Sequence, residues 1–147
     1  MEKRELINII DKILIRLGFI KENNHWIFFD DIIKIVYLKK SNFGNVFFID
    51  YGYILNSVPL ENLNMHIFNR ISSSDVTENA RINELLNIGN DIPNGDRLAG
   101  LEMVLNEKLG KNFLLIKSED DLLCELKKRK HLNDIPLSVK KHFNLEL

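Results

Sequence analysis

Three runs rich in β-branched and aromatic residues follow one another early in the chain, and they constrain its fold more than any other feature. The runs cover residues 25–29, 32–39 and 45–53. The breaks between them, at residues 30–31 and 41–44, are short enough for hairpins. Because strands joined by such tight turns must run antiparallel, the sequence predicts an antiparallel meander.

A helical pattern precedes these runs. Apolar residues recur with helical spacing from Leu6 to Leu17, and Gly18 stands where a left-handed C-terminal cap is expected. A fourth strand is predicted at residues 64–71, where apolar and polar residues alternate imperfectly. The N-terminal part of the chain is therefore expected to form one helix followed by four strands.

The second half of the chain has helical signals. Asp75 with Glu78, and Ser118 with Asp121, have the spacing of capping boxes. Together with the apolar spacing, these signals predict helices at residues 75–89, 98–110, 118–130 and 138–143. Two or three of these helices are expected to pack on the sheet.

Residues 112–117 form a short apolar run that periodicity cannot assign, and we favour an extended conformation for them. The sequence thus predicts a single α+β domain over residues 1–147. Its antiparallel sheet has four strands, or five if residues 112–117 join it.

The predicted third strand is apolar on both of its faces. Val46 and Phe48 lie on one face, and Phe47, Ile49 and Tyr51 lie on the other. A sheet of this kind needs cover on both sides. Its own helices or a partner protein would have to supply that cover.

Composition points to a cytoplasmic protein. The single cysteine, Cys124, cannot form an intramolecular disulfide, which favours a reducing compartment. The N-terminal apolar residues are interrupted by polar and charged ones, unlike a signal peptide, and no apolar run is long enough to span a bilayer. We therefore expect no membrane association.

Charge is distributed unevenly along the chain. The chain has 9 basic (Lys, Arg) and 9 acidic (Asp, Glu) residues in residues 1–75, 5 basic and 10 acidic ones in residues 76–126, and 6 basic and 2 acidic ones in residues 127–147. The acidic stretch suits a basic partner, because complementary charge speeds encounter. The basic tail suits either a helix C-terminus or a nucleic-acid contact.

Three segments carry a family resemblance: LGFIKENNHW, LKKSNFGNVFFIDYG and HIFNRIS. Together they resemble a group of small bacterial proteins of unknown function, with LGFxK, KSNxGN and HIxxR patterns, over about residues 14–71. Some similar proteins sit beside bacterial toxins, as immunity proteins do. The resemblance therefore implies a binding protein of the immunity type and no established enzymatic activity.

Three polar residues on the predicted strands form the main candidate site. Asp50 shares an apolar strand face with Phe48, and a buried carboxylate needs a cation or several hydrogen-bond donors. Arg70 and His66, on the fourth strand, could supply them. The cluster Asp50, His66 and Arg70 would then either bind a ligand and move protons, or form an ion pair that fixes strand register.

Other candidate binding residues are Lys40, Ser41 and Asn42 in the second hairpin, and Trp26 among the strand aromatics. The hairpin lacks the repeated glycines and following helix of a phosphate loop. No nucleophile elbow and no metal-ligand spacing is present, so we expect no metal or cofactor.

The favoured function is a non-enzymatic protein-binding domain, specifically an immunity-type inhibitor of a basic toxin. One alternative is a small hydrolase or ligand-binding protein that uses Asp50, His66 and Arg70. The other is a nucleic-acid module that uses the basic residues between 127 and 142.

Overall fold

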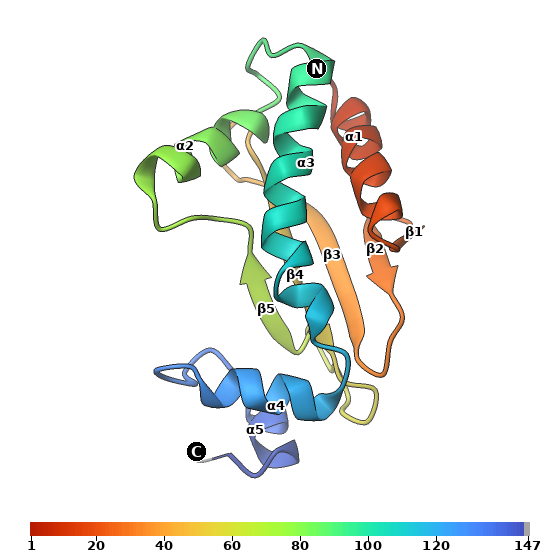
Figure 1. Ribbon diagram of the computed structural model, residues 1–147, viewed down its shortest axis with the longest axis vertical. Coiled ribbons are helices and arrows are strands. Elements are labelled where there is room, and N and C mark those ends of the chain that lie inside the picture. Colours follow the sequence, from red (N-terminus) through yellow and green to blue (C-terminus); the bar gives the residue numbers. More distant parts are fainter. Residues whose placement is uncertain (146–147) are drawn as a thin grey trace.

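The computed structural model describes residues 1–145 and shows an α+β domain built around one sheet (Figure 1). The strands are β1 (Ile20–Glu22), β2 (His25–Phe28), β3 (Ile33–Lys40), β4 (Phe47–Ile54) and β5 (Ile67–Arg70). The helices are α1 (Lys3–Arg16), α2 (Val76–Leu85), α3 (Asn94–Gly110), α4 (Glu119–Lys127) and α5 (Leu137–His142), with a short 3-10 helix, η1 (Phe113–Leu115). The predicted α+β class is confirmed.

The sheet is a meander of five strands in the order β1-β2-β3-β4-β5, with every neighbouring pair antiparallel. Strand β1 is the one that the sequence pattern does not predict. It has only three residues, and all three are exposed, so no buried face imposes an alternating pattern on the sequence. A two-residue turn connects β1 to β2, and Asn23 adopts a φ of 52° there, which asparagine tolerates well.

Residues 112–117 do not join the sheet, contrary to the extended conformation that we expected. Instead the Leu115 amide donates to the Asn112 carbonyl at 3.2 Å, and the segment turns into η1. This turn places the Phe113 ring in the core, with ring centroids 4.9 Å from Tyr53 and 5.0 Å from Tyr51. Aromatic packing with the sheet thus takes the place of a strand ladder.

The predicted helix caps are present. The Asp75 carboxylate accepts from the Glu78 amide at 2.9 Å, and the Ser118 hydroxyl accepts from the Asp121 amide at 3.1 Å. Gly18 has a φ of 100°, and α1 ends there in a pair of backbone bonds typical of a left-handed cap. Helix α2 ends at Leu85, earlier than predicted.

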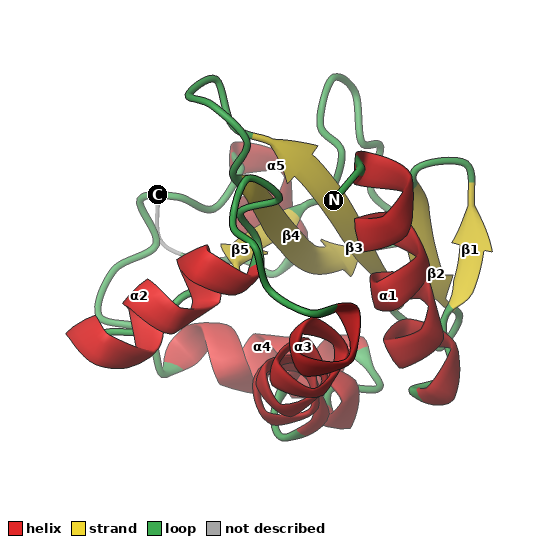
Figure 2. Cartoon of the chain, turned by 90° about the horizontal axis from the view of Figure 1, so that it is seen from above, coloured by secondary structure: helices red, strands yellow, loops and turns green. Residues whose placement is uncertain are grey.

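Helices α1 and α3 lie side by side on one face of the sheet (Figure 2). The strand residues that share this face include the buried Trp26, Val36, Ile49, Tyr53 and Ile67. The core therefore lies between the sheet and these helices. Within residues 1–145, no helix has the length and apolar character needed to cross a membrane.

The opposite face of the sheet is covered only in part. The connection between β4 and β5, residues 55–66, packs there through Met65, which is 6% exposed. Leu63 and Phe68 on the same side remain 42% and 49% exposed. This face, which we call the open face, carries Asp50 and Arg70.

Candidate functional site

An ion pair between Asp50 and Arg70 occupies the open face. The two residues are direct cross-strand partners on β4 and β5. Arg70 Nε donates to Asp50 Oδ1 at 2.7 Å and a terminal nitrogen donates to Oδ2 at 3.2 Å, so the pair is bidentate. The hydrogen bond to Asp50 raises the pKa of Arg70, although partial burial opposes the rise. Arg70 therefore stays charged, and the Asp50 carboxylate, which is 5% exposed, is satisfied.

Two aromatic rings hold the Arg70 guanidinium in place. Its carbon lies 4.2 Å from the centroid of Phe48 and 5.7 Å from that of Phe68. Cation–π contacts of this kind orient a planar guanidinium and shield it from water. The register of β4 and β5 thus produces a preorganised cation on the open face.

His66 does not join this pair. Its Nδ1 accepts from the Leu55 amide at 2.9 Å, and its Nε2 lies 3.2 Å from the Pro59 carbonyl oxygen. This arrangement requires a neutral ring with the proton on Nε2. Because both ring nitrogens bind backbone groups of the connection 55–66, His66 fixes that connection and contacts neither Asp50 nor Arg70 through them.

A pocket of about 570 Å³ opens beside the ion pair, and we call it the sheet pocket. Its apolar wall consists of Leu63, Met65 and Phe68, and Lys39 and Lys40 line it as cations. Tyr37 and Asp50 line it as well. Burial raises the pKa of Tyr37, so its hydroxyl remains a hydrogen-bond donor. The pocket combines apolar and cationic surfaces.

Gly52 allows the apolar wall to approach the sheet. A Cβ atom at this position would overlap the Ile67 carbonyl oxygen and the Met65 sulfur. The absence of a side chain therefore lets the start of β5 and Met65 pack against β4. This close approach places Met65 in the wall of the sheet pocket.

The remaining predicted residues lie in different environments. Lys40 lines the sheet pocket, but the Ser41 hydroxyl accepts from the Phe43 amide at 3.0 Å within the hairpin, and Asn42 is exposed in that turn. Trp26 is 1% exposed, and its indole N–H donates to Asp11 Oδ1 at 2.9 Å. Trp26 is thus a core residue and not the surface residue that a partner-binding role requires.

Sequence reasoning missed several pocket residues: Tyr37, Lys39, Leu63, Met65 and Phe68. Tyr37 pairs with Asp50 across β3 and β4, so strand parity together with the correct register would have found it. Leu63 and Met65 come from an irregular connection, which has no periodic signal. Among residues 1–145, no three His, Cys, Asp or Glu side chains gather as a metal site.

Fold and site define the class of this protein: an α+β domain whose antiparallel meander has helices on one face and an open pocket on the other. The chain belongs to the family DUF4304, a domain of unknown function, which matches residues 10–120. The matched range contains the whole sheet and every residue of the sheet pocket. Comparisons with curated proteins and with solved structures gave no match. The expected membership in a family of unknown function is confirmed.

Proposed function

We propose that this protein is a non-enzymatic domain that binds a protein partner on the open face of its sheet. One observation carries the proposal: the exposed Leu63 and Phe68 line a pocket of about 570 Å³, and the Phe68 ring contacts the stacked guanidinium of Arg70 beside it. Apolar patches with a polar rim are typical of protein interfaces, and arginine and aromatic residues dominate their binding energy.

The chemistry of the site favours recognition over catalysis. Proton transfer needs a group that is free to gain or lose a proton in reach of a substrate. Asp50 and Arg70 bind each other through two hydrogen bonds, and His66 is held by backbone groups. The side chains that remain free at the pocket, such as Lys39 and Phe68, are those that bind a ligand rather than transform it.

The pocket also indicates which partner segment it would accept. Its apolar wall suits an apolar side chain, and Lys39 and Lys40 suit a carboxylate next to that side chain. We therefore expect the bound segment to contain an apolar residue with an acidic neighbour. The stacked guanidinium of Arg70 supplies a rigid surface at the edge of this contact.

More specifically, we propose that the protein is an immunity-type inhibitor that occludes a toxin. Residues 76–126 contain ten acidic and five basic residues, which would steer a partner with net positive charge. Several of these carboxylates already have partners, as in the pairs Lys108–Glu78 and Arg16–Glu102. The acidic helices would thus affect the rate of encounter, and the open face would make the contact.

The test uses the variant Leu63→Ser/Phe68→Ser and the control Val76→Ser/Met103→Ser, whose residues are exposed and line no part of the sheet pocket. Tagged chains are incubated with source-cell lysate, and captured proteins are identified and then purified. We expect one stoichiometric partner that the original chain and the control retain and the open-face variant loses. The purified partner should lose its toxic activity on binding. Equal capture by all three chains would contradict the proposal.

A further inference from the structure

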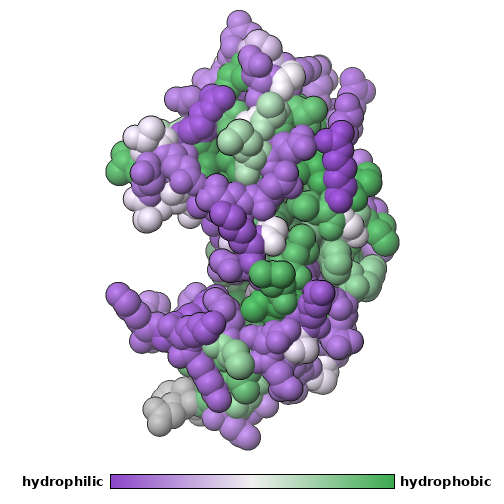
Figure 3. Space-filling model, viewed as in Figure 1, coloured by the Kyte–Doolittle hydropathy of each residue, from purple (hydrophilic) through white to green (hydrophobic). Residues whose placement is uncertain are grey.

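A second pocket lies on the helix side of the sheet, where α3 and α4 meet β4 and β5. Its volume is about 160 Å³. Seven polar side chains line it: Tyr51, Tyr53, Asn69, Lys108, Asn112, Glu125 and Arg129. The Tyr53 hydroxyl already donates to the Phe113 carbonyl oxygen at 3.4 Å. The surface is hollowed on this side, between the region of α2 and the region of α4 (Figure 3). We call this cavity the helix-side pocket.

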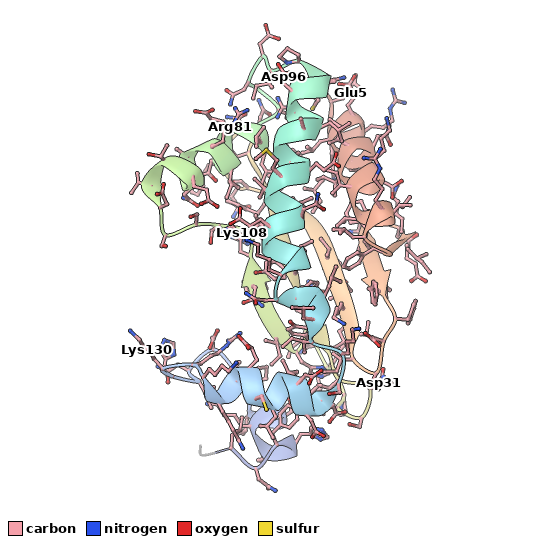
Figure 4. The ribbon with its side chains drawn as sticks, in the orientation of Figure 1. Glu5, Asp31, Arg81, Asp96, Lys108 and Lys130 are labelled. Atoms are coloured by element: carbon pink, nitrogen blue, oxygen red, sulfur yellow. The ribbon has the colours of Figure 1, made fainter. Side chains whose placement is uncertain are left out.

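Two cations from different elements converge on the helix-side pocket. Lys108 lies in the last turn of α3, on the flank that faces the hollow (Figure 4), and Arg129 follows the end of α4. Burial raises the pKa of Tyr51, and the positive charges of Lys108 and Arg129 both act against that rise. Both cations are therefore close enough to influence the same hydroxyl.

The existing ion pairs of these cations leave donors free. Lys108 Nζ lies 3.0 Å from Glu78, and one terminal nitrogen of Arg129 lies 3.5 Å from Asp134, whose side chain is 57% exposed. An ammonium group has three N–H donors and a guanidinium has five. Each cation can thus keep its carboxylate partner and still donate into the pocket.

Neutral polar groups complete the lining. Tyr51 and Asn69 are half-buried and Asn112 is exposed, and within residues 1–145 their side chains form no hydrogen bond to the protein. Convergent polar groups without protein partners are a mark of a ligand site. Together with the two cations, these donors favour an oxygen-rich anion.

Glu125 indicates which kind of anion the pocket prefers. It is the acidic residue of the lining; its Oε2 pairs with Lys128 Nζ at 3.9 Å, and its Oε1 can accept a proton from a ligand. A phosphate group that keeps one proton offers its P–OH, whereas sulfate has no proton to offer. A volume of about 160 Å³ matches about five waters at ~30 Å³ each, which is enough for a phosphate group.

We propose that the helix-side pocket binds a singly protonated phosphate group. Lys108 and Arg129 donate to its oxygens, assisted by the Tyr51 hydroxyl and the two asparagine amides, and Glu125 accepts the proton of the P–OH. The site is separate from the open face and does not depend on a protein partner. Arg129 and Glu125 also lie beyond the range that matches the family, so the C-terminal segment completes this pocket.

The experiment is a titration of the full chain followed by NMR, with phosphate, sulfate and chloride at equal ionic strength and a pH of about 6, where phosphate esters are half protonated. We expect phosphate to shift the side-chain amide signals of Asn69 and Asn112 saturably, and sulfate to bind at least tenfold more weakly. O-phosphoserine in a parallel titration separates the two sources: tighter binding than inorganic phosphate indicates a phosphorylated compound, and weaker binding indicates the free ion.

Variants test the assigned roles. Arg129→Met and Tyr51→Phe should each weaken phosphate binding, the former about tenfold, because a charge-assisted hydrogen bond is lost. Glu125→Gln should remove the preference for phosphate over sulfate. The control is Lys130→Met, which removes an exposed cation next to Arg129 in sequence and outside the pocket. Thermal unfolding checks that each variant folds. Equal shifts with phosphate, sulfate and chloride, or equal loss in the control, would overturn the proposal.

Discussion

Lys34 lies on β3 with a fully buried side chain, which is an unusual place for an ammonium group. Its Nζ lies 3.3 Å from Asp30, whose side chain is 28% exposed, and 5.1 Å from the centroid of the Phe28 ring. Burial lowers the pKa of Lys34 from its ordinary value of 10.5, and the hydrogen bond to Asp30 only partly opposes this effect. The folded protein therefore holds the Lys34 proton less tightly than the unfolded chain does.

This difference predicts a pH dependence of stability. Between the lowered pKa and 10.5 the unfolded chain binds more protons, so the free energy of unfolding contributed by Lys34 rises with pH. At pH about 7 the charged form is penalised, and we expect Lys34→Met to stabilise the protein by about 1 kcal/mol. The gain should shrink as the pH approaches 10.5. Urea unfolding of both chains at several pH values measures it, and a gain that grows with pH would contradict the assignment.

At the scale of elements, α2 and α3 are joined through one buried arginine. Arg97 in the first turns of α3 is fully buried and donates to the carbonyl oxygens of Leu85, Asn87 and Asn90. These groups lie at and beyond the C-terminal end of α2, where carbonyls lack helical partners and carry negative partial charge. The guanidinium thus caps α2 from a neighbouring helix, and the chain can leave the helix at Leu85.

Removing this cap should loosen both helices. We expect Arg97→Met to lower the free energy of unfolding by about 3 kcal/mol, because buried carbonyls lose their donors while the volume is nearly kept. Arg81→Met is the matched control: Arg81 is half exposed, pairs with Glu84 on the surface, and should change stability by less than about 0.5 kcal/mol. Urea unfolding measures both. A loss of equal size in the two variants would show that Arg97 contributes only surface charge.

At the scale of the whole molecule, the two faces of the sheet differ in what the fold requires of them. The helix face holds most of the core, whereas Leu63 and Phe68 on the open face remain 42% and 49% exposed to water after folding. Hydrophobic stabilisation scales with the apolar area that is removed from water. Leu63 and Phe68 therefore contribute less to folding than the fully buried core side chains do, as expected for a binding surface.

We expect the variant Leu63→Ser/Phe68→Ser to retain the stability of the original chain within about 1 kcal/mol. Removal of the ring of Phe68 costs a contact with Arg70, which remains stacked on Phe48. Urea unfolding and gel filtration of the purified variant check this result. A loss of several kcal/mol would mean that these residues serve the core, and the binding test with this variant could then not be interpreted as a surface effect.

Much of the secondary structure follows from local sequence. The caps at Asp75 and Ser118 and the left-handed Gly18 form hydrogen bonds within three or four residues, so their patterns are readable along the chain. The same holds for the tight hairpins that order the meander. Strand parity left two roles open for Asp50 and Arg70, a ligand site or an ion pair. The register of β4 and β5 makes them cross-strand partners, and they form the ion pair.

The tertiary structure decided which other residues join Asp50, Arg70 and Lys40 at the candidate site. His66 was expected near Asp50, but its partners are backbone groups of an irregular connection, whose path no periodicity encodes. Trp26 was a candidate binding residue, but it is buried on the face that the helices cover, and its indole N–H donates to Asp11 of α1. Residues 113–115 form a 3-10 helix where we expected an extended conformation, because the Phe113 ring packs against Tyr51 and Tyr53 of the sheet.

The sequence by itself thus determined the type and order of most elements, because helix and strand periodicity, caps and turns arise from interactions between near neighbours. The tertiary structure decided which face the helices cover and where the two pockets lie. Both pockets combine residues distant in sequence, from Asn24 to Phe68 in one and from Tyr51 to Arg129 in the other. Such sets are brought together only by packing, which depends on the shapes of all the elements at once.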